Sequence, residues 1–125
     1  TYYGTETGMT GENDPDCRKA FDWEESHWDK DLRRHYQKLM ALRKIRRALQ
    51  EGSVRFCSQG DVFLMERRKD GERLVTAINN TGAPKTCTLC AKGAKDLLGG
   101  GSYGGEGEAL SMEVPPFTSM ILELE

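Results

Sequence analysis

The apolar residues of this chain change their spacing at Gly52, and that change limits the folds open to it. Between Asp31 and about Leu49, apolar residues recur every three or four positions, which predicts one long amphipathic helix. Asp29 or Asp31 can cap its start, and Gly52 can cap its end. Beyond Gly52 apolar and polar residues alternate, as in strands that bury one face. The sequence therefore predicts a helix followed by a mainly β segment.

Turn signals divide the β segment into short strands. Asp70-Gly71 lies between the β-prone runs 61–68 and 72–80, and this is the strongest short-range signal of a hairpin. The glycine-rich stretch 99–105 is interpreted as a loose loop, because no Lys-Ser/Thr pair and no helix follow it, as they do in phosphate-binding loops. The set predicts a compact antiparallel β-sandwich over 53–125, with further strands at 53–57, 85–90, 110–114 and 118–124.

The charges are unevenly distributed along the 125 residues. Residues 30–50 carry eight Lys and Arg against one acid, whereas the whole chain has a net charge of −2. A basic cluster raises the question of nucleic acid, but nucleic-acid modules are usually basic as whole domains. Basic residues toward the end of a helix also complement its dipole. We therefore expect no nucleic-acid partner, and no membrane partner either, since no apolar run approaches the ~20 residues of a membrane-spanning helix.

The four cysteines include one CxxC pair, Cys87 and Cys90. A zinc site needs about four ligands, and the sequence offers no second CxxC, so we expect neither a metal nor a cofactor. Residues 85–90 alternate as a strand does, which predicts ordinary thiols rather than a redox motif. Few cysteines without a disulfide framework fit a reducing compartment, and we expect the protein to be cytoplasmic.

Residues 1–30 are loop-like, rich in acids and aromatic residues, and contain the candidate binding site. Asp14 and Arg18 lie four residues apart on a turn that Pro15 begins. Carboxylates accept hydrogen bonds from sugar hydroxyls and Arg donates in a fixed fork, while nearby aromatic rings could stack on sugar faces. Two alternatives remain: the pair only pins its loop, or the acids bind calcium, although their spacing does not match an EF-hand loop.

Several motifs resemble the α-amylase family of glycoside hydrolases, and most of all its cyclomaltodextrinase, neopullulanase and maltogenic amylase group. The stretches Tyr2-Tyr3-Gly4-Thr5-Glu6 and Asp14-Pro15-Asp16-Cys17-Arg18 resemble the end of the catalytic barrel. Residues 39–43 resemble the last barrel helix, and residues 66–68 and 75–80 resemble the β-sandwich that follows it. One departure is Arg47, where relatives tend to carry Pro before Ala-Leu.

The resemblance implies a two-part chain that is mainly β. Residues 1–52 are then the last loop and helix of a truncated (β/α)8 barrel, and residues 53–125 are a C-terminal antiparallel β-sandwich. The absence of Met at the first position favours the interpretation that the barrel is truncated. The parent is expected to cleave α-1,4-glucosidic bonds in cyclodextrins, pullulan or starch oligosaccharides with retention, using carboxylates that lie upstream. This segment alone is then inactive.

The resemblance also assigns roles and partners within the parent. Asp14 and Arg18 match positions that hold glucose units of the α-glucan substrate, and the barrel of the same chain is the other expected partner. A homodimer is left open. The alternative function is a non-catalytic module for glycan binding or domain packing. Packing is favoured because residues 53–125 contain no Trp that could form a flat platform for sugar.

Overall fold

The computed structural model describes residues 2–105 and 107–125, and these form two compact units. One extends to Ala41 and the other from Leu42 to Glu125. The second unit thus includes eleven residues before Ser53, where we predict that a sandwich domain begins. That boundary, between a barrel and a sandwich, stays a prediction.

The first unit consists of three short 3-10 turns and most of one helix. The turns are η1 (Thr5–Thr7), η2 (Asp16–Arg18) and η3 (Glu25–His27), and the helix α1 extends over Lys30–Ile45. Of the two caps that the sequence offered, Asp29 is the one used: its Oδ1 accepts from the backbone N–H groups of residues 31 and 32 at 3.1 and 2.9 Å. Within the described residues no helix has both the length and the apolar composition needed to cross a membrane.

The predicted helix does not continue to Leu49, because it is broken at Arg46. Arg46 has extended backbone angles, φ −102° and ψ 107°, and a second helix, α2 (Arg47–Glu51), begins after it. The Arg46 guanidinium lies 2.6 Å from a carboxylate oxygen of Glu123 and 3.1 Å from one of Glu72. Glu72 also accepts from the backbone N–H of Ala48 at 2.8 Å and so caps α2. Side chains distant in sequence therefore hold the break open.

The position of the break predicts which residues accept proline. Arg47 is the first residue of α2 and follows an extended residue, the arrangement in which proline is tolerated. Arg47→Pro should therefore change the free energy of unfolding by less than about 1 kcal/mol. Leu49→Pro should cost about 3 kcal/mol or more, because it removes the Leu49 N–H bond to the Arg46 carbonyl inside the helix. Urea unfolding of the two variants tests this, and equal losses would contradict the assigned break.

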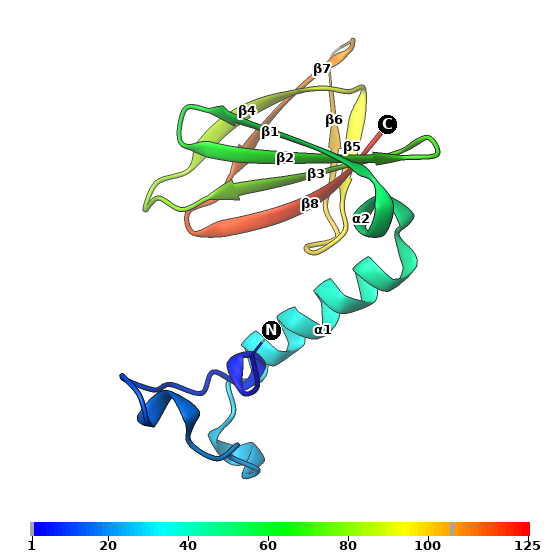
Figure 1. The fold of residues 1–125 in the computed structure, drawn as a ribbon. Coiled ribbons are helices and arrows are strands. Elements are labelled where there is room, and N and C mark those ends of the chain that lie inside the picture. The colour runs from blue at the N-terminus through cyan, green and yellow to red at the C-terminus, as the bar shows by residue number, and fades with distance from the viewer. Residues whose placement is uncertain (1, 106) are drawn as a thin grey trace. The chain divides into compact units, whose positions relative to one another are not determined.

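The second unit contains two antiparallel sheets (Figure 1). One has six strands in the order β1-β2-β3-β8-β5-β6, and the other pairs β4 with β7. At the predicted hairpin between β2 and β3, Asp70 and Gly71 have φ of 49° and 86°. The bounds are β1 (Ser53–Gln59), β2 (Val62–Lys69), β3 (Glu72–Asn79), β4 (Lys85–Cys90), β5 (Gly93–Asp96), β6 (Ser102–Gly104), β7 (Ala109–Val114) and β8 (Thr118–Leu124).

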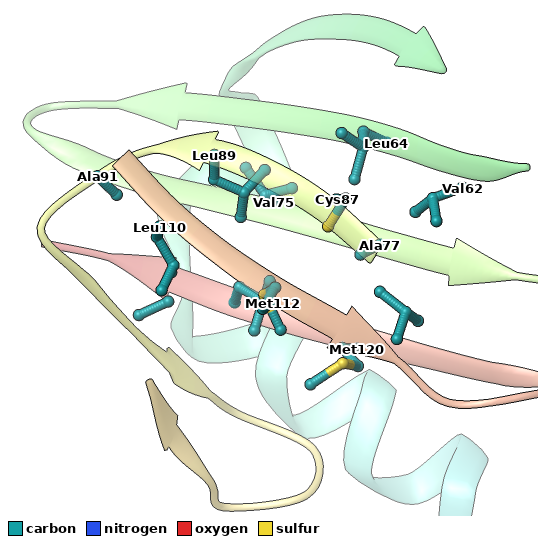
Figure 2. Close-up of a cluster of buried hydrophobic side chains, with 13 residues drawn as sticks. Val62, Leu64, Val75, Ala77, Cys87, Leu89, Ala91, Leu110, Met112 and Met120 are labelled. Carbon is teal, nitrogen blue, oxygen red and sulfur yellow. The ribbon is translucent and has the colours of Figure 1, made fainter. Parts of the chain in front are cut away.

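The core lies between the two sheets (Figure 2). Val62, Leu64 and Val75 from the six-stranded sheet are at most 3% exposed, and Leu110 of β7 is fully buried. In β4 the buried residues alternate with exposed ones, so Cys87 is in the core while Cys90 is exposed. The predicted antiparallel β-sandwich is confirmed, and the CxxC pair lies on a strand.

The glycine-rich stretch is more ordered than the loose loop that we expected. β6 lies within it and pairs with β5, in the register Gly93↔Gly104. The buried carboxylate of Asp96 accepts from the backbone N–H groups of Leu98 and Gly99 at 2.9 and 3.0 Å. A Cβ on Gly99 would lie 2.5 Å from that carboxylate. The stretch is glycine-rich partly because its backbone must wrap closely around Asp96.

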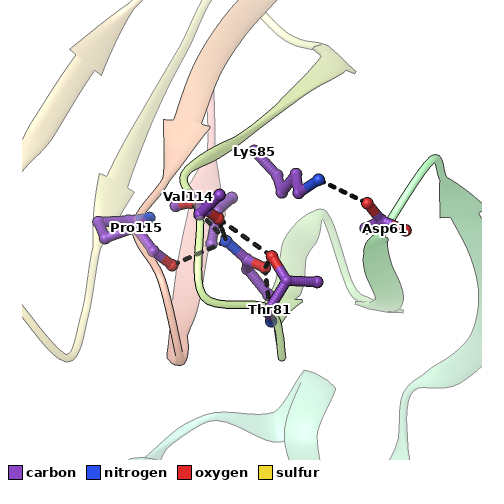
Figure 3. A network of polar contacts seen from close by, with 7 residues as sticks. Asp61, Thr81, Lys85, Val114 and Pro115 are labelled. Carbon is purple, nitrogen blue, oxygen red and sulfur yellow. Dashed lines mark hydrogen bonds and ion pairs between the residues drawn. The ribbon is translucent and has the colours of Figure 1, made fainter.

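Asn79, at the end of β3, joins two turns through bonds to Thr81, Val114 and Pro115, which Figure 3 labels. Its amide nitrogen donates to the carbonyl oxygens of Ala83, Val114 and Pro115 at 2.8, 3.0 and 3.0 Å. Its amide oxygen accepts from the backbone N–H and the hydroxyl of Thr81 at 3.0 and 2.8 Å. The side chain is 1% exposed, so one buried amide connects the turn after β3 with the end of β7.

Candidate functional site

The two residues that we predict to bind substrate, Asp14 and Arg18, are in direct contact. Turn η2 brings Arg18 back toward Asp14. Nε of Arg18 lies 2.8 Å from Oδ1 of Asp14. A second guanidinium nitrogen pairs with the other carboxylate oxygen. The side chain of Arg18 is 64% exposed, and that of Asp14 is 58% exposed. The loop is closed by the backbone N–H of Glu12, which donates to Asp16 at 2.8 Å.

This geometry is compatible with both interpretations of the pair. A bidentate ion pair pins a loop, and an exposed pair keeps lone pairs and N–H groups free for a ligand. Calcium finds less support, because Asp14 faces Arg18 and Asp16 faces the backbone. Among the described residues, no group of three or more His, Cys, Asp or Glu side chains could hold a metal ion. Substrate binding by Asp14 and Arg18 stays a prediction.

The aromatic residues of the first unit stabilise its loops. The hydroxyl of Tyr3 donates to the carbonyl of Lys19 at 2.8 Å, which ties the start of the chain to the residue after η2. Trp28 donates its Nε1–H to the carbonyl of Asp22 at 2.7 Å. Trp23 differs from them, because it is 81% exposed and contacts Phe21 edge to face, with ring centroids 4.7 Å apart. It is the most exposed of these rings.

The structure also shows an ion pair that the sequence did not reveal. His27 Nδ1 lies 2.8 Å from a carboxylate oxygen of Asp22, and both residues line a hollow of about 510 Å³ with Lys19 and Trp28. The hydrogen bond to Asp22 raises the pKa of His27. The backbone N–H of Glu24 and then His27 lower the pKa of Asp22. An Asp five residues before a His is too common a pattern to have predicted this pair.

The raised pKa of His27 makes the local order of residues 22–28 dependent on pH. The pair contributes fully below the ordinary His pKa of 6.5, and its contribution is lost as the pH rises through the higher pKa of the folded state. In an NMR titration, His27 should titrate above 6.5, and Asp22→Asn should lower its pKa. Glu25→Gln, which removes a neighbouring acid without touching the pair, should leave it unchanged. A His27 pKa that does not respond to Asp22→Asn would contradict the pairing.

Comparison with known proteins decides the family. Residues 61–124 match the family model described as "Beta-galactosidase C-terminal domain". A cyclomaltodextrinase of Geobacillus thermopakistaniensis is 37% identical over 99% of this chain, and neopullulanase 2 of Thermoactinomyces vulgaris is 33% identical over 97%. The crystal structure of an Anoxybacillus α-amylase superposes with a TM-score of 0.87 at 28% identity, covering 98% of this chain. The chain belongs to this domain family. Its similarity to the cyclomaltodextrinase, the neopullulanase and the α-amylase matches it to the C-terminal segment of α-amylase-family glycoside hydrolases.

The chain corresponds to a small part of these relatives. It spans 22% of the length of the cyclomaltodextrinase and of the neopullulanase, and 28% of the α-amylase chain. The comparisons confirm the resemblance of the motifs, and with the fold they confirm a C-terminal β-sandwich of this family. They extend over both units, since the alignments cover nearly the whole chain.

Proposed function

We propose that the protein containing this chain hydrolyses α-1,4-glucosidic bonds in cyclodextrins, pullulan or starch oligosaccharides with retention of configuration. The observation that carries the proposal is the identity of 37% and 33% to a cyclomaltodextrinase and a neopullulanase over nearly the whole chain, the acidic loop included. We place the protein in the cytoplasm, because all four cysteines are free thiols.

In this proposal the chain positions substrate and supplies no catalytic carboxylate. A retaining glycosidase needs two carboxyl groups about 5–5.5 Å apart and free to act on the bond. Three acids of the loop have other partners: Asp14 pairs with Arg18, Asp22 with His27, and Asp29 caps α1. Asp14 and Arg18 would instead hold glucose units, and orienting a substrate contributes to rate without chemistry at these groups.

The test is activity of the isolated 125-residue chain and of the complete protein. Reducing-sugar release from β-cyclodextrin and maltotriose should be absent for the chain and present for the complete protein. Activity of the isolated chain that disappears when one of its own acids is changed would overturn the assignment of catalysis to residues outside it. A complete protein inactive on cyclodextrin, pullulan and starch oligosaccharides would overturn the substrate class.

A second candidate function, domain packing, is supported by the outer face of the six-stranded sheet. Phe56 and Phe63 are 65% and 41% exposed there, and their rings are stacked with centroids 5.9 Å apart. On the same sheet α2 contacts β2 and β3 and buries Ala48 completely. Two neighbours of the exposed pair, Val54 and Met65, are apolar, and Ser58 opposite Phe63 is a small polar one. The pair therefore suits the catalytic barrel of the same protein better than a glycan.

A further inference from the structure

The inner face of the six-stranded sheet is wider than the sheet that covers it. Two strands, β4 and β7, face six, and β1 at the edge is exposed along its whole length. Beside β4 this leaves a hollow of about 390 Å³, within the size range of small-molecule sites. It lies wholly within the second unit, and the proposed function does not use it.

The hollow has an apolar floor. Leu64, Val75 and Leu89, which belong to the core, are 3%, 3% and 6% exposed and line it from three strands. One wall is closed by Gln59 of β1, whose side-chain amide bonds to the backbone of Thr88 in β4. The N···O distances are 2.7 and 2.8 Å. The Gln59 amide therefore makes the two hydrogen bonds to Thr88 that the backbone of a neighbouring strand would otherwise make. The hollow is therefore bounded by residues with fixed partners.

One of the charged groups at its mouth, Arg55, has no partner among the residues that the structure describes. The carboxylate of Glu66 accepts from Arg73 at 2.5 Å and from Arg68 at 2.9 Å. Burial disfavours the charged form of Glu66, but the bonds from Arg68 and Arg73 outweigh burial and lower its pKa, so it stays ionised. Arg55 lies directly opposite Glu66 in the β1–β2 register and lines the hollow too. It has no ion pair or side-chain hydrogen bond with any residue that the structure describes.

We propose that this hollow binds a small organic anion, with its acidic group on Arg55 and its apolar body on Leu64, Val75 and Leu89. A neutral sugar fits less well, because Oε1 of Glu66, two guanidinium nitrogens of Arg73 and the side-chain amide of Gln59 already have hydrogen-bond partners. Arg presents up to five donors in a fork that matches a carboxylate. Burial of the apolar body adds free energy in proportion to its area.

The test is an NMR titration of the 125-residue chain with octanoate. Saturable shifts at millimolar concentrations should be confined to residues 55–59, 64–66, 73–75 and 88–90. Octanamide, of the same length but uncharged, should bind at least about ten-fold more weakly, since charge-assisted hydrogen bonds are roughly twice as strong as neutral ones. Arg55→Gln should weaken octanoate to a similar degree, and Arg55→Lys should restore part of the loss.

The matched control is Lys92→Gln, which removes one exposed positive charge that does not line the hollow. It should leave octanoate binding unchanged. Equal binding of octanamide and octanoate, equal binding by Arg55→Gln, shifts outside these residues or no saturation would each overturn the proposal. None of these results bears on glycosidase activity, so the proposed function is tested separately.

Discussion

Asn79→Asp is expected to destabilise the second unit by about 3–5 kcal/mol at neutral pH, the cost of a buried charge without a partner. The new carboxylate would face three carbonyl oxygens, of Ala83, Val114 and Pro115, where the amide now donates. Its contact with Thr81 would survive, because either oxygen can accept. Burial and the three carbonyl oxygens should raise the pKa of this Asp above its ordinary value of about 4, so protonation should restore part of the stability as the pH falls toward 4. Urea unfolding at neutral and acidic pH measures both effects.

The adjacent Asn80 offers a matched control. It is exposed, and among the described residues its side chain has no hydrogen-bond partner, so Asn80→Asp should change the free energy of unfolding by less than about 0.5 kcal/mol. If both variants unfold at the same urea concentration, the amide of Asn79 does not hold the two turns together.

In the complete protein, Asp14→Ala or Arg18→Ala is expected to lower kcat/KM of the proposed hydrolysis about 10–150-fold, if hydrogen bonds to charged groups worth about 1.5–3 kcal/mol act in the transition state. The residues are more than half exposed, so the melting temperature should barely change. Steady-state kinetics on β-cyclodextrin measure the loss.

Because Asp14 and Arg18 pair with each other, the control must separate a ligand contact from a loop contact. Arg34→Ala breaks another exposed ion pair, with Asp31 on α1 at 3.0 Å, and should leave kcat/KM unchanged. Arg18→Lys keeps the charge but not the fork, so it should recover only part of the activity. Wild-type kcat/KM in Asp14→Ala and Arg18→Ala would assign the pair to pinning its loop.

Much of the second unit could be predicted from local sequence. The alternation of apolar residues, with Asp70-Gly71 between two runs, placed β2 and β3 to within one residue. The 85–90 strand is found with the predicted bounds. These predictions succeeded because strand alternation and turn conformation depend on neighbours a few residues away. β5 and β6 escaped the same approach, since three- and four-residue strands containing glycine have no alternation to detect.

The candidate site could be predicted only in part. The contact between Asp14 and Arg18 follows from their spacing of four residues on one turn, which brings side chains together locally, while their role in binding stays a prediction. The pairing of His27 with Asp22 was missed, because the segment between them is irregular and no spacing rule governs it. The sequence could not show that Arg55 lacks a partner, because this depends on which arginines pair with Glu66. One of those arginines, Arg73, lies on the neighbouring strand β3.

The sequence by itself determined the secondary-structure class, the change from helix to strand at Gly52 and the hairpin at Asp70-Gly71, because each depends on local backbone preference and the period of apolar residues. Only the tertiary structure decided where the helix ends. Arg46 leaves the helix to pair with Glu72 and Glu123, which lie 26 and 77 residues further along the chain. Local propensity does not depend on such distant partners. The ion pairs contribute free energy only after folding has brought the strands that carry Glu72 and Glu123 close to Arg46.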